Sequence, residues 1–168
     1  VKISNIKSYK NPEKWSGYLA YTYDLQKKIK KDTIKGKKTN KKPSSKNGYP
    51  LVVRNLDTEK EDTIPFVLDY TFSKEGKFIS YVTSGDKNFT KTGVYIKDLS
   101  NNTTKHIYES HVKTKYHKLE LSDSGKHLAF VVDTDSTKAY ERNNEIYTWN
   151  KKNDLKLILD RKSSPDGY

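Results

Sequence analysis

Four histidines are the side chains of this sequence that titrate nearest to neutral pH, so their spacing is the first test for chemistry. They stand at positions 106, 111, 117 and 127. His111 and His117 are six residues apart, which matches neither the helical nor the strand spacing of zinc ligands. We therefore expect His106, His111, His117 and His127 to be surface or strand residues.

Carboxylates are the other candidates for a metal site. Asp123, Asp133 and Asp135 lie near Ser122, but their spacing lacks the D-x-D-x-D-G pattern of a calcium loop. The chain contains no Cys, which excludes a cysteine nucleophile, thiolate zinc ligation and a disulfide framework within it. We predict no metal site and no cofactor.

A serine nucleophile is commonly held in a Gly-x-Ser-x-Gly turn. The chain has eight glycines, and none of them stands four residues from another with Ser midway between the two. We therefore assign no catalytic residue to this chain.

The net charge of +12 directs attention to polyanions, and the location of the charge decides between partners. The segment 27–46 holds ten Lys and one Asp, which leaves the rest of the chain with only +3. Lys outnumbers Arg thirty to three, whereas base recognition relies on Arg for bidentate contacts with guanine. We predict no sequence-specific nucleic-acid partner, and phosphate attraction through Lys27–Lys46 stays open.

The elements that position these side chains form an internal repeat. FSKEGKFISYV at 72–82 matches LSDSGKHLAFV at 121–131 at a spacing of 49. The segment 93–107 pairs with 50–64 at an offset of 43 and with 144–159 at an offset of about 52. KWSGYLAYTY at 14–23 begins the first copy, with its glycine shifted by one. The unit therefore occurs three times, over approximately 9–64, 66–110 and 116–161.

Each unit is predicted to form four short strands, because runs of β-branched and aromatic residues alternate with turns of Gly, Asn, Asp, Thr and Lys. Leu, Ile, Val and Phe make up only about 21% of the chain, which argues against a large helical core. Four antiparallel strands every ~40–50 residues are typical of a propeller blade. We predict an all-β fold, a β-propeller fragment of about three blades, with a β-sandwich as the alternative.

Aromatic residues could stack on nucleic-acid bases, but here they recur at equivalent strand positions of the repeat. We therefore expect them, together with Trp15 and Trp149, to form the core between blades. The tyrosines concerned are Tyr18, Tyr21, Tyr23, Tyr70, Tyr81, Tyr95, Tyr108 and Tyr147.

The lysine-rich segment interrupts the first unit. Tyr21 and Val53 are 32 residues apart, whereas the equivalent Tyr81 and Ile96 are 15 apart. We interpret the lysine-rich segment 27–46 as a loop insertion that is dispensable for folding, because it lacks apolar periodicity. Three blades are also too few to close a ring of the usual four to eight. We expect the outer blade faces, with Leu19, Tyr21, Phe130 and Val132, to be exposed.

The turns Ser73-Lys74-Glu75-Gly76-Lys77 and Ser122-Asp123-Ser124-Gly125-Lys126 resemble the S-P-D-G-K turn of TolB-type, WD40-like propeller repeats. The chain is also similar to the N-terminal propeller of bacterial serine peptidases of the prolyl oligopeptidase family. The similar features are a Trp near a first strand, the strand pair from Val53 to Ile64, the strand E-I-Y-x-W-N, and the endings L-D-R and P-D-G-Y. The resemblance covers most of 9–168 outside the lysine insertion. The chain departs from the family turn at Lys74 and Ser124.

The resemblance implies a non-catalytic propeller portion that gates substrate access and docks an α/β-hydrolase domain. Its partners would be the remainder of the parent chain or another protein, with a peptide substrate, in a periplasmic or secreted protein. The alternative is a free-standing TolB-like propeller that binds proteins. No apolar run approaches the ~20 residues that span a bilayer. Because the chain starts at Val1 and contains no Met, we expect a processed protein or a fragment.

Overall fold

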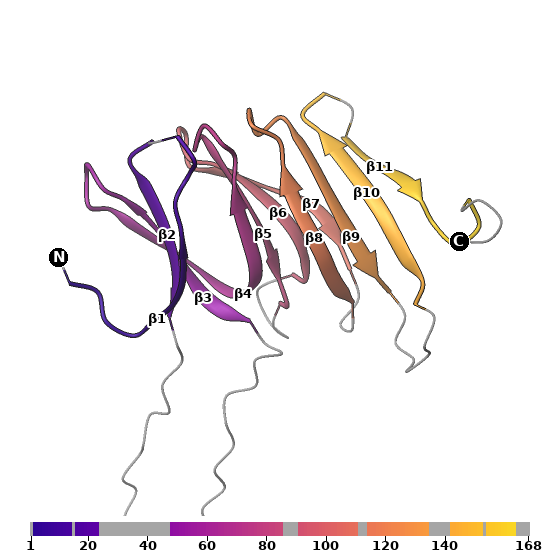
Figure 1. Ribbon diagram of the computed structural model, residues 1–168, viewed down its shortest axis with the longest axis horizontal. Coiled ribbons are helices and arrows are strands. Elements are labelled where there is room, and N and C mark those ends of the chain that lie inside the picture. Colours follow the sequence, from indigo (N-terminus) through magenta and orange to yellow (C-terminus); the bar gives the residue numbers. More distant parts are fainter. Residues whose placement is uncertain are drawn as a thin grey trace, which may run out of the picture.

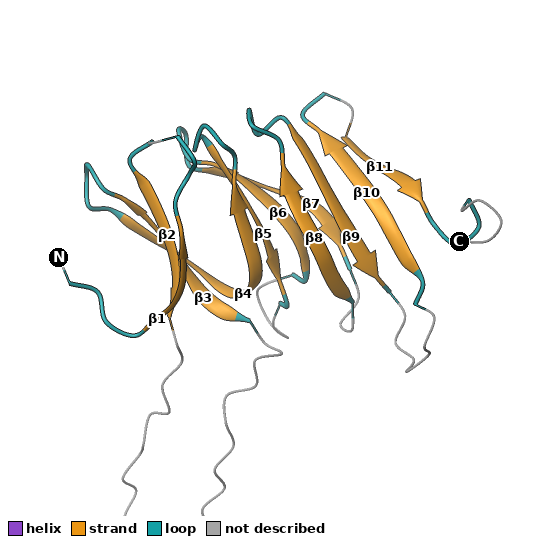
Figure 2. Ribbon diagram, viewed as in Figure 1, coloured by secondary structure: helices purple, strands orange, loops and turns teal. Residues whose placement is uncertain are grey.

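The computed structural model describes residues 2–14, 16–23, 48–85, 91–110, 114–134, 142–152 and 154–163. The regular structure of these residues consists entirely of strands (Figure 2). The strands are β1 (Ile6–Lys10), β2 (Tyr18–Tyr23), β3 (Tyr49–Asn55), β4 (Glu61–Phe72), β5 (Phe78–Thr83), β6 (Gly93–Asp98), β7 (Thr103–Glu109), β8 (Lys115–Leu121), β9 (His127–Asp133), β10 (Asn144–Asn150) and β11 (Asp154–Leu159).

The strands form two antiparallel sheets, one of β1 to β7 and one of β8 to β11, and each strand pairs with its neighbours in sequence. Figure 1 shows the strands following one another from the N-terminal to the C-terminal end of the molecule, with the two termini at opposite ends. The sheets therefore form an open series rather than a closed ring.

Strand β4 belongs to two successive blades. Its first half, up to Val67, pairs with β3, and its second half, from Val67, pairs with β5. Between these halves, Phe66 follows Pro65 and adopts a left-handed φ of 59°. Blade 1 is therefore β1 to β3 with the first half of β4, blade 2 is the second half of β4 with β5 to β7, and blade 3 is β8 to β11.

The core lies between the blades, because side chains alternate between the two faces of each strand. In β5, Ile79 and Tyr81 pack toward blade 1, whereas Val82 packs toward blade 3. The cluster between blades 1 and 2 contains Ala20, Leu51, Val53, Ile64, Val67, Tyr70, Phe72, Ile79, Tyr81 and Leu99. The cluster between blades 2 and 3 contains Val82, Val94, Ile96, Ile107, Leu119, Leu128, Phe130, Val132 and Trp149.

This alternation corrects one expectation about exposure. Phe130 and Val132 are buried, at 1% and 0% exposure, because they occupy the side of blade 3 that packs on blade 2. Tyr21 is also buried, and Leu19 is half-buried. The all-β, antiparallel and open arrangement of about three blades is the one that the repeats predict.

Candidate interaction surfaces

A row of aromatic rings crosses blade 2 on the side that faces blade 1. The strand register places Tyr70 opposite Tyr81, Tyr81 opposite Tyr95, and Tyr95 opposite His106. The rings of Tyr81 and Tyr95 stack at 5.3 Å, and those of Tyr95 and His106 stack at 4.2 Å. Burial raises the pKa of Tyr81 to about 12. These rings are therefore used for packing inside the protein and are not displayed for bases.

The same row recurs in blade 3, on the side that faces blade 2. Phe130 and Tyr147 stack at 5.6 Å, and the ring of Tyr108 from blade 2 lies 4.9 Å from Tyr147. In blade 1 the corresponding row faces away from blade 2 and begins with Tyr9, which is 67% exposed. Further along this row Tyr21 and Val52 are buried, at 0% and 2% exposure, so only the Tyr9 end of the row is exposed.

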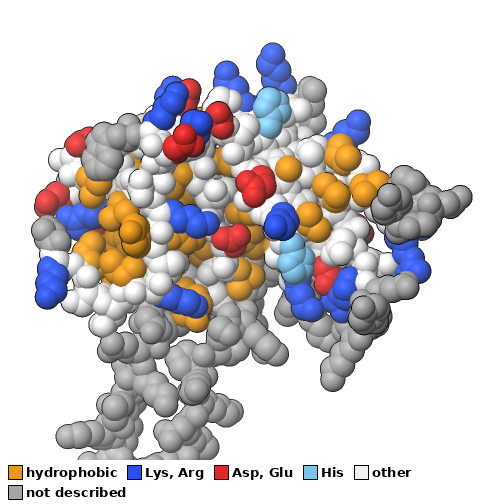
Figure 3. Space-filling model, in the orientation of Figure 1, with side chains coloured by type: hydrophobic (Ala, Val, Ile, Leu, Met, Phe, Trp, Pro, Cys, Tyr) orange, Lys and Arg blue, Asp and Glu red, His pale blue; other side chains and the backbone are white. Residues whose placement is uncertain are grey.

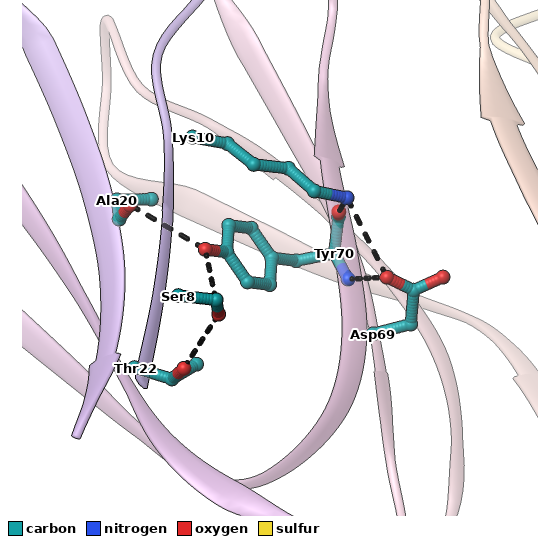
Figure 4. A network of polar contacts seen from close by, with 6 residues as sticks. All are labelled: Ser8, Lys10, Ala20, Thr22, Asp69 and Tyr70. Atoms are coloured by element: carbon teal, nitrogen blue, oxygen red, sulfur yellow. Dashed lines mark hydrogen bonds and ion pairs between the residues drawn. The ribbon is translucent and has the colours of Figure 1, made fainter. Parts of the chain in front are cut away.

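Polar contacts join the first strands of blades 1 and 2 (Figure 4). The Tyr70 hydroxyl lies 3.5 Å from both the Ser8 hydroxyl and the Ala20 carbonyl oxygen, and Ser8 Oγ lies 2.7 Å from Thr22 Oγ1. Lys10 Nζ donates to the Tyr70 carbonyl and lies 3.6 Å from Asp69 Oδ1. Burial raises the pKa of Tyr70, so its hydroxyl stays protonated and able to donate. The network fixes blade 1 on blade 2 through β1 and β4.

A groove of about 380 Å³ lies between blades 1 and 2 at the end of the strands where β3 turns into β4. Its wall includes Tyr18, whose hydroxyl donates to the Leu99 carbonyl at 2.9 Å. An ion pair between Lys97 Nζ and Asp62 Oδ2, at 2.5 Å, lies in the same wall. The Lys97 side chain is only 7% exposed, and the Asp62 carboxylate in the same wall neutralises its charge.

A second groove, of about 430 Å³, lies between blades 2 and 3 at the equivalent place. Phe78 takes the position of Tyr18, and Trp149 takes the position of Lys97. Lys105 Nζ lies 5.6 Å from the centre of the Trp149 ring, and Lys151 Nζ lies 5.5 Å from the centre of the Phe78 ring. Equivalent positions in successive blades thus carry side chains of different chemical type, a charged one in the first groove and an aromatic one in the second.

Charged and apolar side chains are mixed over the view in Figure 3, with hydrophobic groups gathered near the β1–β2 end and again near the β10–β11 end. Tyr9 at one end is exposed, as are Leu157 and Ile158 at the other, at 43% and 50%. A molecule that ended at these faces would leave apolar groups in water, so they are candidate contact surfaces.

Three of the four histidines fall within the described residues and lie apart from one another in the fold. His106 is on β7 in the aromatic row, His117 is on β8, and His127 begins β9. The His106 Nε2 is buried without a hydrogen-bond partner among the described residues. Within this part of the chain, no three residues of the His, Cys, Asp and Glu types gather in a way that could hold a metal ion.

The candidate carboxylates do not converge either. Asp133, 2% exposed, accepts hydrogen bonds from Nε and Nη2 of Arg142 at 2.9 and 2.6 Å. Asp123 is exposed in the turn before β9, where Ser122 Oγ accepts from the His127 backbone N–H. Asp133 therefore serves an ion pair with Arg142, which stands at the other end of the connection between β9 and β10.

Several predicted features lie outside the described residues: Trp15, His111, Asp135 and the segment Lys27–Lys46. Of the tyrosines expected in the core, Tyr70 and Tyr81 are buried and Tyr18 and Tyr95 pack against them. Tyr108 and Tyr147 pack against the second cluster, which contains Trp149. Tyr21 and Tyr23 instead meet edge to face, with ring centres 5.3 Å apart. Tyr21 also donates to Glu61.

Comparison with protein families finds no matching family model, and no curated protein matches. Solved structures do match. The β-propeller domain of the trilobed protease from Pyrococcus furiosus is 16% identical, with a TM-score of 0.59 over 95% of this chain and 42% of that one. The Pyrococcus horikoshii acylaminoacyl peptidase is 14% identical, with a TM-score of 0.58 over 93% of this chain and 24% of that one. The tricorn protease is 12% identical, with a TM-score of 0.57 over 93% and 13%.

The chain thus spans less than half of the length of each of these structures. The described residues include no helix of the length and apolarity needed to cross a membrane. At such low identity the likeness is one of fold. The chain has a β-propeller fold, of which it contains an open portion.

Proposed function

We propose that this chain is the non-catalytic β-propeller portion of a serine peptidase that resembles prolyl oligopeptidases. In this role it limits the access of substrate peptides and docks the α/β-hydrolase domain of the same polypeptide. The observation that carries the proposal is the match of three open blades to part of the propeller domain of one protease and to part of two further peptidases.

The open ends of the fold support this role. Blade 2 is covered on both sides, whereas blades 1 and 3 are each covered on one side by another described blade. A free-standing binding module would be expected to cover its own apolar faces. Under this proposal the repeat units are approximately 9–64, 66–110 and 116–161, and the remainder of the ring and the hydrolase domain come from the parent polypeptide.

The proposal extends to partners and location. A peptide would be the substrate of the parent enzyme, and the protein would be periplasmic or secreted in a bacterium. The lysine-rich segment 27–46 would attract anionic surfaces without reading a nucleic-acid sequence, because Lys acts as a point charge.

The test compares this chain with its parent polypeptide. Both are incubated with chromogenic prolyl and alanyl peptides and with a phosphonate probe that labels active-site serines. We expect labelling and turnover from the parent and neither from residues 1–168. Labelling of residues 1–168 would overturn the non-catalytic role, and an unlabelled, inactive parent would support the free-standing interaction propeller instead.

A further inference from the structure

In each groove, a residue on the last strand of one blade contacts a residue on the third strand of the next blade. Between blades 1 and 2 the contact joins Asp62, on the last strand of blade 1, to Lys97, on the third strand of blade 2. Lys97 is almost fully buried, whereas Asp62 is half-exposed. An ammonium group in such a position needs a partner, because an unpaired buried charge is costly.

Between blades 2 and 3 the equivalent contact joins Lys105, on the last strand of blade 2, to Trp149, on the third strand of blade 3. The ammonium group lies 5.6 Å from the centre of the indole, within the range of a cation–π interaction. Lys105 also forms an ion pair of 2.9 Å with Asp154 of blade 3. Lys105 therefore contacts the following blade through both a ring and a carboxylate.

The strand register shows that these positions are equivalent and identifies a third. Asp62 lies opposite Val53. Lys105 lies opposite Ile96, which is the residue 43 positions after Val53. Lys156 lies opposite Thr148, which is 52 residues after Ile96. Lys156 is thus the residue of blade 3 that corresponds to Asp62 and Lys105. Its side chain is exposed and forms no hydrogen bond or ion pair with the side chain of another described residue.

The side chains around Lys156 also repeat those of a covered face. Val82 and Val94 of blade 2 are fully buried under blade 3. Their counterparts in blade 3 are Val131 and Ile146, which are only half-buried. Thr148 is likewise half-buried, whereas its counterpart Ile96 is 5% exposed. The face keeps its apolar character without a cover from the described residues.

We propose that this face of blade 3 binds a further propeller blade that presents a carboxylate or an aromatic ring to Lys156. The proposal rests on the function proposed above only in that both place the chain within a larger propeller. The partner is defined by the two groups that contact the equivalent Lys105, which are the carboxylate of Asp154 and the ring of Trp149.

Charge argues that the occupant is not a second copy of this chain. Arg54 stands 43 residues before Lys97, on the face of blade 1 that points away from blade 2, and is therefore the residue that would meet Lys156 of another copy. Arg54 is already paired with Glu61 Oε1 at 2.7 Å. Docking blade 3 of one copy on blade 1 of another would bring two cations together, and such juxtaposition opposes association.

The first test uses this chain as its own probe. Lys156→Glu places a carboxylate where it would meet Arg54 of another copy, in the geometry of the pair between Asp62 and Lys97. By sedimentation equilibrium, we expect head-to-tail self-association of this variant to be at least ~10-fold tighter than that of the unmodified chain and to weaken with salt. Adding Arg54→Met should abolish the gain. Lys152→Glu, an equal charge change at an exposed turn residue, is the matched control.

Self-association of Lys156→Glu no stronger than that of Lys152→Glu would overturn the assignment of this face. The second test uses the parent polypeptide, in which Lys156→Glu should lower the melting temperature and Lys152→Glu should not. An equal effect of both variants there would also overturn the proposal. Neither readout depends on peptidase activity, so a failure of the proposed function can be told apart from a failure of this inference.

Discussion

At the scale of single residues, the charged groups that hold the fold are the buried ones. Lys97 and Asp133 are both buried, and each has an oppositely charged partner, Asp62 and Arg142, at 2.5 and 2.6 Å. Exposed pairs such as Lys91 with Glu109 have similar distances but lie in water, where such pairs contribute little. Burial therefore decides which ion pair matters for stability.

Replacing Asp62 with Asn should destabilise the fold, because the Lys97 ammonium stays buried and loses its counterion. We expect a loss of about 2 kcal/mol in the free energy of unfolding, below the cost for a fully buried pair because Asp62 is half-exposed. Urea denaturation measures this loss. Glu109→Gln, which opens an exposed pair of 2.9 Å, is the matched control and should change the free energy by less than ~0.5 kcal/mol.

Lys97→Met separates the charge effect from packing. It removes the buried cation while keeping much of the side-chain volume, and it leaves only the half-exposed Asp62 carboxylate unpaired. It should therefore cost less than Asp62→Asn. If Asp62→Asn lowered the free energy of unfolding no more than Glu109→Gln, the Lys97 ammonium would have to be hydrogen-bonded to water or to another acceptor in solution.

Alkaline pH should unfold the protein through its buried tyrosines. Burial raises the pKa of Tyr81 from its ordinary value of 10.0 to about 12, so the folded state favours the neutral phenol. The stability that this provides is complete below pH 10 and is lost as the pH rises toward 12. Phenolate absorbance and circular dichroism, recorded together during an alkaline titration, should show ionisation coinciding with loss of the sheets.

Tyr81→Phe should shift that alkaline transition to higher pH, because the phenol that resists ionisation is gone. Tyr9→Phe changes an exposed ring and should leave the transition in place. An alkaline transition unaffected by Tyr81→Phe would assign the effect to the other tyrosines whose pKa is raised by burial, among them Tyr116 and Tyr147.

At the scale of elements, the turns before the second strand of each blade interlock. The backbone N–H of Glu75 donates to the Asp123 carbonyl at 3.3 Å, and that of Lys14 donates to the Lys74 carbonyl at 2.9 Å. Gly125 has a φ of 70°, and the Phe78 ring of the preceding blade lies against it. The glycine of the repeated turn is thus required both by backbone conformation and by the approach of the neighbouring blade.

Gly125→Ala should therefore destabilise the protein strongly. A Cβ at this position would lie 2.2 Å from Phe78 Cδ2, and a left-handed backbone costs a non-glycine residue about 1–2 kcal/mol by itself. We expect a total loss of at least about 2 kcal/mol in thermal or urea unfolding. Ser124→Ala in the same turn is the control, and a comparable loss from it would mean that the turn is fixed by something other than Gly125.

The sequence was sufficient to predict these elements because their period and turn chemistry are local properties. The spacing of 49 between the two Gly-containing turns, and the alternation within FISYV and HLAFVV, require no knowledge of neighbouring blades. Which face of a strand meets which blade is a tertiary property. For that reason Phe130 and Val132 were expected at the surface, whereas they are buried against blade 2. The partners of Asp62 and Lys105 were hidden for the same reason, since each partner lies on another blade.

At the scale of the whole molecule, two blade-to-blade interfaces must stabilise three blades. Among the described residues, only blade 2 packs against another blade on both sides, and apolar groups such as Tyr9 and Ile158 stay exposed at the two ends. A propeller portion of this kind gains stability when its end faces are covered.

Residues 1–168 alone should therefore self-associate or melt at a lower temperature, over a broader range, than the same residues in the parent polypeptide. Sedimentation equilibrium over a tenfold range of concentration, with parallel thermal melts, measures both effects. A compact monomer at every concentration, with a sharp melt matching that of the parent, would contradict the view that the end faces need a cover.

The order of the strands has a consequence for how the protein is made. Every hydrogen-bonded strand pair in both sheets joins neighbours in sequence, so no strand has to wait for a partner from a distant part of the chain. Short separations between contacting segments favour rapid folding, and domains commonly begin to fold from the N-terminus during synthesis. Blade 1 can assemble on the ribosome before blade 3 has been translated. Because β4 runs on from blade 1 into blade 2, the completed first blade then offers a template edge to the residues of blade 2 that emerge next.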